Sequence, residues 1–175
     1  MHVKGFQVSS VSRRILIWSC IVIFIVYGIP RIFIFDVSVV NGSSMDDTLK
    51  NGDVVVARKI GLDHFERGNI VTVQRAGSCG RLVKRIVGLP GETVDIDDNG
   101  LIFVNGQLID DQYQVVVSNA SYPYMHLVLE QDEYFISGDN RANSNDSRYF
   151  GAVGLDEIKD VILLRVFPFT LLAGG

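Results

Sequence analysis

The clearest β-hairpin signal in the chain is Leu101-Ile102-Phe103-Val104-Asn105-Gly106-Gln107-Leu108-Ile109. Two apolar runs flank Asn-Gly, the dipeptide that most readily takes the positive φ angles of a two-residue turn. A turn this short joins neighbouring antiparallel strands, because parallel strands need a longer crossover. The centre of the chain is therefore expected to be β-structure.

Short runs rich in β-branched residues lie on both sides of this hairpin, and turn residues separate them. Close spacing of short strands with Gly-rich turns predicts a mainly β fold, as a coiled antiparallel sheet or a barrel-like body. One helical turn is expected at 155–159, and segment 110–130 has no readable pattern. The further strands are predicted at 37–40, 54–57, 70–73, 82–87, 93–96, 134–136 and 161–167.

The N-terminal segment is apolar over 15–29, and a second apolar run, 32–35, follows Pro30 and Arg31. A membrane span needs about 20 residues, and 15–35 is long enough if Arg31 reaches toward the headgroups. The segment is therefore expected to be a transmembrane signal anchor.

Arg13 and Arg14 precede the predicted anchor. By the positive-inside rule, residues 1–14 are expected in the cytoplasm and residues 36–175 outside the cell, as one extracytoplasmic domain of a single-pass protein of the cell membrane. Cleavage of the segment would need small residues at −3 and −1, which Tyr27, Ile29 and Arg31 do not supply. A re-entrant segment is the remaining alternative.

Composition excludes several classes of protein. The chain has 175 residues, 47% of them hydrophobic, and a mean hydropathy of +0.25, so it is not disordered. Its net charge of −4 argues against nucleic acid as a partner. Histidines are isolated and no zinc spacing occurs, so neither a metal nor a cofactor is expected. Cys20 and Cys79 are expected on opposite sides of the membrane and unpaired.

Ser44 follows Gly42 and Ser43, small residues that let a substrate approach closely. A serine hydroxyl is a poor nucleophile until a neighbouring base removes its proton, and a desolvated lysine can be that base. An ordinary turn serine is the alternative for this string taken alone. Its place just after the predicted anchor favours a nucleophile that works at the membrane surface.

Lys84 is the candidate base. Strand alternation puts Leu82, Lys84 and Ile86 on one face, so the lysine is expected among apolar neighbours. Burial lowers a lysine pKa from about 10.4, and the neutral amine can accept a proton from Ser44. A strand lysine with its ammonium group in water is the alternative.

A dense polar loop follows the predicted strand 134–136. It offers many hydrogen-bonding groups, and Asp139 or Asp146 is expected to pair with Arg141 or Arg148. Such a loop can fix the geometry of catalytic groups, whereas an ordinary solvated loop is the alternative. Its sequence is Gly138-Asp139-Asn140-Arg141-Ala142-Asn143-Ser144-Asn145-Asp146-Ser147-Arg148.

Together these segments resemble type I signal peptidases, membrane-bound Ser/Lys endopeptidases that remove signal peptides from exported proteins. The resemblance covers nearly the whole chain, in the family's order, and the compact length is similar to the form typical of Gram-positive bacteria. The matching segments are the anchor, the Ser-Met box 42–49, the run 52–56, the Lys-Arg box 82–91 and the Gly-Asp-Asn-Arg box 138–151.

The resemblance implies roles for individual residues. Ser44 is the nucleophile and gives an oxyanion-hole amide, Lys84 is the general base, and Ser144 orients the lysine. Asp139, Arg141, Asp146 and Arg148 form the supporting network. Cleavage after Ala-x-Ala follows from apolar pockets for small side chains, which are lined by Val40, Met45, Leu49, Leu82 and Val83.

The implied partners are preprotein signal peptides and the lipid bilayer, with the secretion machinery or pilin subunits as further candidates. A specialised pilus-associated homologue, acting as a pilin-processing enzyme or an assembly chaperone, is the alternative function. Self-cleaving Ser/Lys repressors share a related fold but are cytosolic, and the anchor disfavours them. A purely structural membrane protein is a further alternative.

The chain departs from the family pattern at three positions. Asp47 stands where the family usually has proline, and its carboxylate near Lys84 would oppose the lowered pKa. Gly42 stands where some members have a serine that helps the oxyanion hole, so the second donor is left open. Ala142 replaces a commonly polar residue. Asp47→Pro is expected to raise activity near neutral pH.

Overall fold

The computed structural model describes residues 10–28, 34–46, 48–59, 64–77, 80–109, 112–113, 125–167 and 170–171. It divides into two compact units, residues 1–35 and 36–175. Asp47 and Cys79 lie outside the described residues, so what the sequence predicts for them stays a prediction.

The first unit contains helix α1 (Ser10–Ile23), which continues as one π-helical stretch, η1 (Phe24–Gly28). Within the described residues, no helix has the length and apolar character that crossing a membrane requires. The expected continuous span over 15–35 is thus not found: α1 starts five residues earlier, and its regular turns end at Ile23. The π-helical stretch that follows ends at Gly28, a weak helix former.

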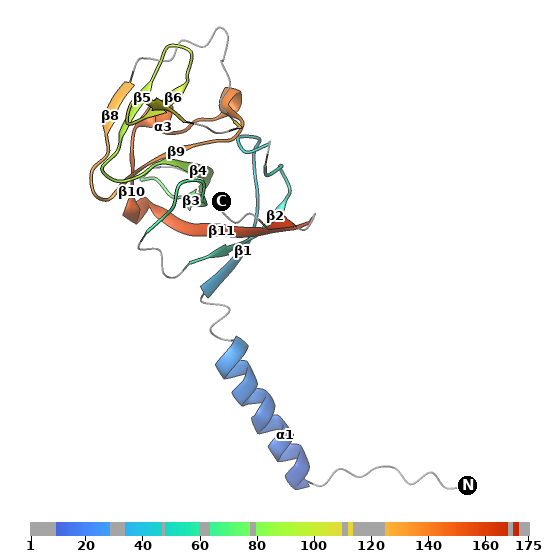
Figure 1. The fold of residues 1–175 in the computed structure, drawn as a ribbon. Helices are drawn as coiled ribbons and strands as arrows, with labels where there is room; N and C mark the ends of the chain where they lie inside the picture. The colour runs from blue at the N-terminus through green and yellow to red at the C-terminus, as the bar shows by residue number, and fades with distance from the viewer. Residues whose placement is uncertain are drawn as a thin grey trace. The chain divides into compact units, whose positions relative to one another are not determined.

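The second unit is mainly β, as predicted. Its main sheet has the strand order β1-β2-β11-β3-β4-β9-β10, with β12 paired to β11, and a smaller sheet has the order β7-β6-β5-β8. Figure 1 shows β5, β6 and β8 gathered at one end of this unit and the long β11 lying beside β2. The paired strands whose register is defined are all antiparallel.

The strands of this unit are β1 (Phe35–Val39), β2 (Val54–Arg58), β3 (Ile70–Val73), β4 (Leu82–Gly88), β5 (Thr93–Ile96), β6 (Ile102–Val104), β7 (Gln107–Leu108), β8 (Met125–Val128), β9 (Glu133–Ser137), β10 (Val153–Gly154), β11 (Ile158–Phe167) and β12 (Thr170–Leu171). Short helical turns are η2 (Arg141–Asn143), α3 (Ser147–Phe150) and η3 (Leu155–Glu157). The sequence did not predict β8, β10 or β12, and β11 begins three residues before its predicted start. The helical turn expected at 155–159 is confirmed in part: η3 covers its first three residues, and the last two belong to β11.

The predicted hairpin is confirmed. Asn105 and Gly106 have φ angles of 52° and 77°, the left-handed values that a two-residue turn of this type requires. Phe103 pairs with Leu108 across it. The turn joins β6 to β7 in the smaller sheet, and the candidate catalytic residues lie on the main sheet and its loops.

Candidate active site

The turn that carries Ser44 follows directly on β1, the edge strand of the main sheet. Gly42 has a φ of +105°, a conformation that favours glycine. Beyond Ser44, the amides of Thr48 and Leu49 both donate to the carbonyl of Met45 and close one helical turn. The sequence therefore folds here into a tight turn that leaves Ser44 half-buried.

Apolar side chains hold this turn against the core. Val40, Met45 and Leu49 are 4%, 1% and 0% exposed, and they pack with side chains of β2, β3 and β11. Burial of each such side chain contributes roughly 1.5–3 kcal/mol. Val83 packs on the same cluster, whereas Leu82 packs on another. Four of the five predicted pocket residues are thus gathered, three of them inside the core.

Lys84 lies in the middle of β4, between β3 and β9, and is 3% exposed. Its Nζ donates to Ser44 Oγ at 2.6 Å. The strand alternation that singled out Lys84 is present, since Ile86 on the same face is fully buried. The structure therefore brings together two residues 40 positions apart that the sequence named as nucleophile and base.

Burial is the largest cause that lowers the pKa of Lys84 below its ordinary value, because the ammonium group loses its hydration. The charges of Asp146 and Asp139 act the other way, and the Arg148 guanidinium lowers the pKa further. Burial outweighs the carboxylates. A neutral amine is therefore more accessible here than for a solvated lysine, and in that form Nζ can accept the proton of the Ser44 hydroxyl, 2.6 Å away.

The loop after β9 is joined to the turn that carries Ser44 by direct hydrogen bonds. The Asn140 amide donates to the carbonyl of Ser44 at 3.0 Å. The Asn140 side chain donates to the carbonyl of Ser43 at 3.0 Å, and Asn143 Nδ2 donates to Ser43 Oγ at 2.8 Å. A Cβ at Gly138 would lie 2.4 Å from the Ser44 carbonyl oxygen. Only glycine fits where the loop meets the turn.

Asp146 and Arg148 form a fully buried ion pair. Arg148 Nε donates to Asp146 Oδ1 at 2.8 Å and Nη2 donates to Oδ2 at 2.9 Å. The Gly138 amide adds a third bond to this carboxylate, at 2.9 Å. Burial alone would raise the pKa of Asp146, but the Arg148 guanidinium, the Ser144 hydroxyl and the Gly138 amide hold it below the ordinary value. The predicted pairing of these two residues is present.

Ser144 and Arg141 occupy the same loop. Arg141 is 2% exposed and its Nε donates to the Gly138 carbonyl at 2.9 Å. Ser144 Oγ is buried beside Gly138. None of its contacts among the described residues meets hydrogen-bond geometry, but its hydroxyl contributes to lowering the pKa of the Asp146 carboxyl. The contact between Ser144 and Lys84 that the resemblance implies therefore stays a prediction.

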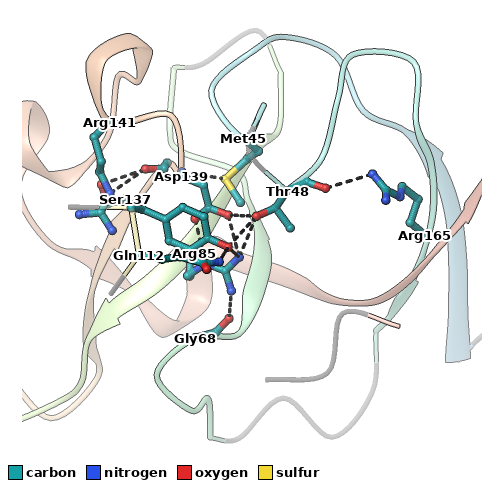
Figure 2. Close-up of polar contacts among 11 residues, drawn as sticks. Met45, Thr48, Gly68, Arg85, Gln112, Ser137, Asp139, Arg141 and Arg165 are labelled. Carbon is teal, nitrogen blue, oxygen red and sulfur yellow. Dashed lines mark hydrogen bonds and ion pairs between the residues drawn. The ribbon is translucent and has the colours of Figure 1, made fainter. Parts of the chain in front are cut away.

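Asp139 pairs with a residue that sequence reasoning missed. Arg85 donates to it twice, from Nε at 2.8 Å and from Nη2 at 2.6 Å, instead of Arg141 or Arg148. Figure 2 shows Arg85, Asp139 and Thr48 converging, with Met45 Sδ beside them. The signal was present, because alternation along β4 puts Arg85 between Val83 and Val87 on the face opposite Lys84.

Thr48 and Tyr113 complete this second polar cluster. Thr48 Oγ1 donates to Asp139 Oδ2 at 2.5 Å and lies 2.8 Å from the Tyr113 hydroxyl. The Arg85 guanidinium lies 5.0 Å from the centre of the Tyr113 ring. Nothing in the sequence marked Tyr113, because it belongs to segment 110–130, where no periodicity is readable.

Among the described residues, no three His, Cys, Asp or Glu side chains lie together in a way that could hold a metal ion. Cys20 is a free, exposed thiol on α1. The groups that meet around Ser44 are instead an amine, amides, carboxylates and guanidiniums. This set of groups can transfer a proton from a serine and orient it, which is the chemistry of acyl transfer.

Comparison with known proteins identifies the family. The family model described as "Signal peptidase, peptidase S26" matches residues 13–167. The chain belongs to this family. Signal peptidase IB of Staphylococcus aureus (strain COL) is 32% identical over 180 residues, which cover 91% of this chain and 93% of that protein. Signal peptidase I P of Bacillus subtilis subsp. natto is 31% identical and covers 90% of both chains.

Two further matches cover less. "Probable signal peptidase I-2" of Synechocystis sp. is 32% identical over 146 residues, and the match spans 66% of that protein's length, slightly less than two thirds. The crystal structure of a signal peptidase I from Enterococcus faecalis V583 is 31% identical, with a TM-score of 0.46, over 57% of this chain and 97% of the other. The predicted family is confirmed, and so is the predicted class of enzyme, a serine peptidase.

Proposed function

We propose that this chain is a membrane-bound endopeptidase that removes N-terminal signal peptides from exported preproteins, with Ser44 and Lys84 as its catalytic pair. The observation that carries the proposal is the 2.6 Å contact between Lys84 Nζ and Ser44 Oγ on a lysine that is 3% exposed. Family membership supports the substrate class, and the contact between the two side chains supports the catalytic pair.

The reaction begins with proton transfer. Neutral Lys84 takes the proton of Ser44 Oγ, and the oxygen attacks the scissile carbonyl carbon to give a tetrahedral intermediate. The Ser44 amide donates to the oxyanion. When the C–N bond breaks, the Lys84 ammonium returns the proton to the leaving amine, which is the new N-terminus of the mature protein. An ester between Ser44 and the signal peptide remains.

Water then resolves the ester. Lys84, neutral again, takes a proton from the water as the water oxygen attacks the acyl carbon. When the bond between the acyl carbon and Ser44 Oγ breaks, the Lys84 ammonium returns that proton to Oγ, which regenerates the Ser44 hydroxyl and the neutral amine. No cofactor enters either half of the reaction. Ser144, buried beside Gly138, is assigned the orientation of the lysine, and Asp139, Arg141, Asp146 and Arg148 hold the loop that contacts the serine turn.

Selection of small residues at −1 and −3 is assigned to Val40, Met45, Leu49 and Val83, which pack in one apolar cluster, and to Leu82, which packs on another. Leu82 and Val83 are half-buried, while the other three are buried in the core. Small pockets with a rigid floor accept alanine and exclude larger side chains, because a packed core does not yield by a methylene without cost. Cleavage after Ala-x-Ala follows.

The membrane assignment rests on α1. Ile15, Leu16, Ile17 and Trp18 are between 57% and 65% exposed, and exposed apolar area costs roughly 25 cal/mol per Å² in water. We assign residues 1–14 to the cytoplasm, 15–35 to a single-pass signal anchor and 36–175 to the extracellular catalytic domain. The lipid bilayer is then a partner, with the secretion machinery as a further candidate, and nucleic acid is not. No described contact favours the pilus-associated alternative.

Processing of a preprotein in detergent micelles tests the function. The parent is expected to cleave after an Ala-x-Ala site, and Ser44→Ala is expected to abolish cleavage. Ser38→Ala, on β1 six residues upstream, is the matched control and is expected to cleave like the parent. If the folded parent does not cleave the preprotein, the general activity is refuted, and the result favours an enzyme that acts on a dedicated substrate.

A further inference from the structure

Tyr113 makes polar contacts for which the proposed chemistry gives no reason. It is half-buried, and its hydroxyl lies within hydrogen-bond distance of three of the side chains that the structure describes. Thr48 Oγ1 is 2.8 Å away, Gln112 Nε2 donates at 2.8 Å and Arg85 Nη2 donates at 3.3 Å. The tyrosine therefore connects a segment without a family motif to the turn that carries Ser44.

Counting protons gives these bonds a direction. The single proton of Thr48 Oγ1 goes to Asp139 Oδ2 at 2.5 Å. Thr48 must therefore accept from Tyr113, and the Tyr113 oxygen accepts from Gln112 and Arg85. The donors run in one direction, Gln112 to Tyr113 to Thr48 to the Asp139 carboxylate. Bonds aligned this way polarise and strengthen one another.

Thr48 is held from every side. Its amide donates to the Met45 carbonyl at 2.8 Å, within the turn that starts at Ser44. Its own carbonyl accepts from Arg165 Nη1 on β11 at 3.1 Å, a contact drawn in Figure 2. The Thr48 hydroxyl accepts from Tyr113 at 2.8 Å and, over a longer distance of 3.3 Å, from Arg85 Nη2. A shift of Thr48 is therefore passed to Ser44 through one turn of backbone.

We propose that Tyr113 is a positioning residue for the cleavage reaction, acting through Thr48 on the turn that presents Ser44 to Lys84. The proposal rests on the proposed function. Tyr113 touches neither reacting atom, so its effect is expected on the rate of the chemical step and not on substrate binding. A displacement of 1 Å in a reacting group can cost about 100-fold in rate, and loss of one of several supports should cost less.

The test compares hydroxyl deletions. Tyr113→Phe keeps the ring under Arg85 and removes the hydroxyl, which donates to Thr48 and accepts from Gln112 and Arg85. The kcat is expected to fall roughly 5- to 20-fold with KM unchanged. The kcat of Thr48→Val is expected to be lower still. Thr48→Ser keeps the hydroxyl, so its kcat is expected to be close to that of the parent. Tyr134→Phe is the matched control, because that ring packs on Phe65 in the core, and it is expected to keep the parent rate.

A double variant separates positioning from simple support of the fold. If Tyr113 acts through Thr48, Tyr113→Phe combined with Thr48→Val should be no slower than Thr48→Val alone. Multiplied losses, a rise in KM with constant kcat, or a parent-like Tyr113→Phe would each overturn the proposal. Rates are taken per folded enzyme well below the melting temperature.

The same assay separates the two levels of inference. A parent that leaves the preprotein uncut refutes the proposed function. A parent that cleaves, together with an inactive Ser44→Ala and a fully active Tyr113→Phe, refutes the role of Tyr113 alone.

Discussion

Lys84 Nζ and Ser44 Oγ lie 2.6 Å apart across the junction of β4 and the turn that follows β1. The contact joins an edge element to the centre of the sheet, so both partners depend on the whole main sheet for their position. Burial at that junction gives the lysine its lowered pKa. The same burial must therefore affect both catalysis and stability, and each effect can be measured.

Replacement of Lys84 by arginine should remove activity without unfolding the protein. Arginine stays protonated at all accessible pH values, so it can fill the site but cannot take the Ser44 proton. A positioned general base is worth about 10²–10⁴-fold, and cleavage is expected to fall by that factor. Lys59→Arg, at an exposed ion pair with Asp36, is the control and should cleave normally. Retained activity in Lys84→Arg would remove the lysine-base mechanism.

Replacement of Lys84 by methionine should stabilise the fold. The folded pKa lies below the ordinary value, so the unfolded chain binds more protons between the two pKa values and stability rises with pH across that window. Below it, the cost of the buried lysine is fully present. Lys84→Met is expected to melt higher near neutral pH, by roughly 2–4 °C per kcal/mol gained. The difference should vanish as the pH approaches the unfolded pKa.

Melting curves of both proteins between about pH 6 and pH 10 decide this prediction. A methionine variant that is less stable than the parent at neutral pH would mean that the carboxylates near Lys84 outweigh burial.

Strand β4 shows which features of the site can be predicted from the sequence and which cannot. Alternation located the strand and put Lys84 on an apolar face, because a period of two is a local property of the chain. The partner of Asp139 is not local: Arg85 competes with Arg141 and Arg148, and only the tertiary arrangement chooses among them. Tyr113 shows the limit most clearly, since no periodicity surrounds it and its contacts come from distant elements.

The acid limb of the pH–rate profile should respond to Asp139. Its negative charge raises the pKa of Lys84, so Asp139→Asn is expected to lower that pKa and move the acid limb to lower pH. Arg85 would lose its charged partner, and breaking a buried pair costs about 3–5 kcal/mol, so rates must be taken per folded enzyme.

A matched variant isolates the charge effect. Asp53 is also bonded to an arginine, Arg165 Nη1, at 3.0 Å, but it is not among the charges that shift Lys84. Asp53→Asn is expected to leave the acid limb in place. A profile of Asp139→Asn that matches the parent would show that Lys84 does not sense this carboxylate.

Gly138 is the position where the loop and the serine turn leave no room. A Cβ there would lie 2.3 Å from Ser144 Oγ and 2.4 Å from the Ser44 carbonyl oxygen, closer than real contacts allow. Gly138→Ala must therefore push the serine turn away from Lys84. We expect cleavage to fall about 100-fold or more, because a displacement of 1 Å is enough for that loss.

Gly80→Ala provides the control for this substitution, because a Cβ at Gly80 meets no atom within 4 Å and activity should be retained. Comparing kcat and melting temperature for the two alanine variants separates the steric effect from a general one. Parent-like turnover in Gly138→Ala would mean that Ser44 does not depend on its contact with this loop.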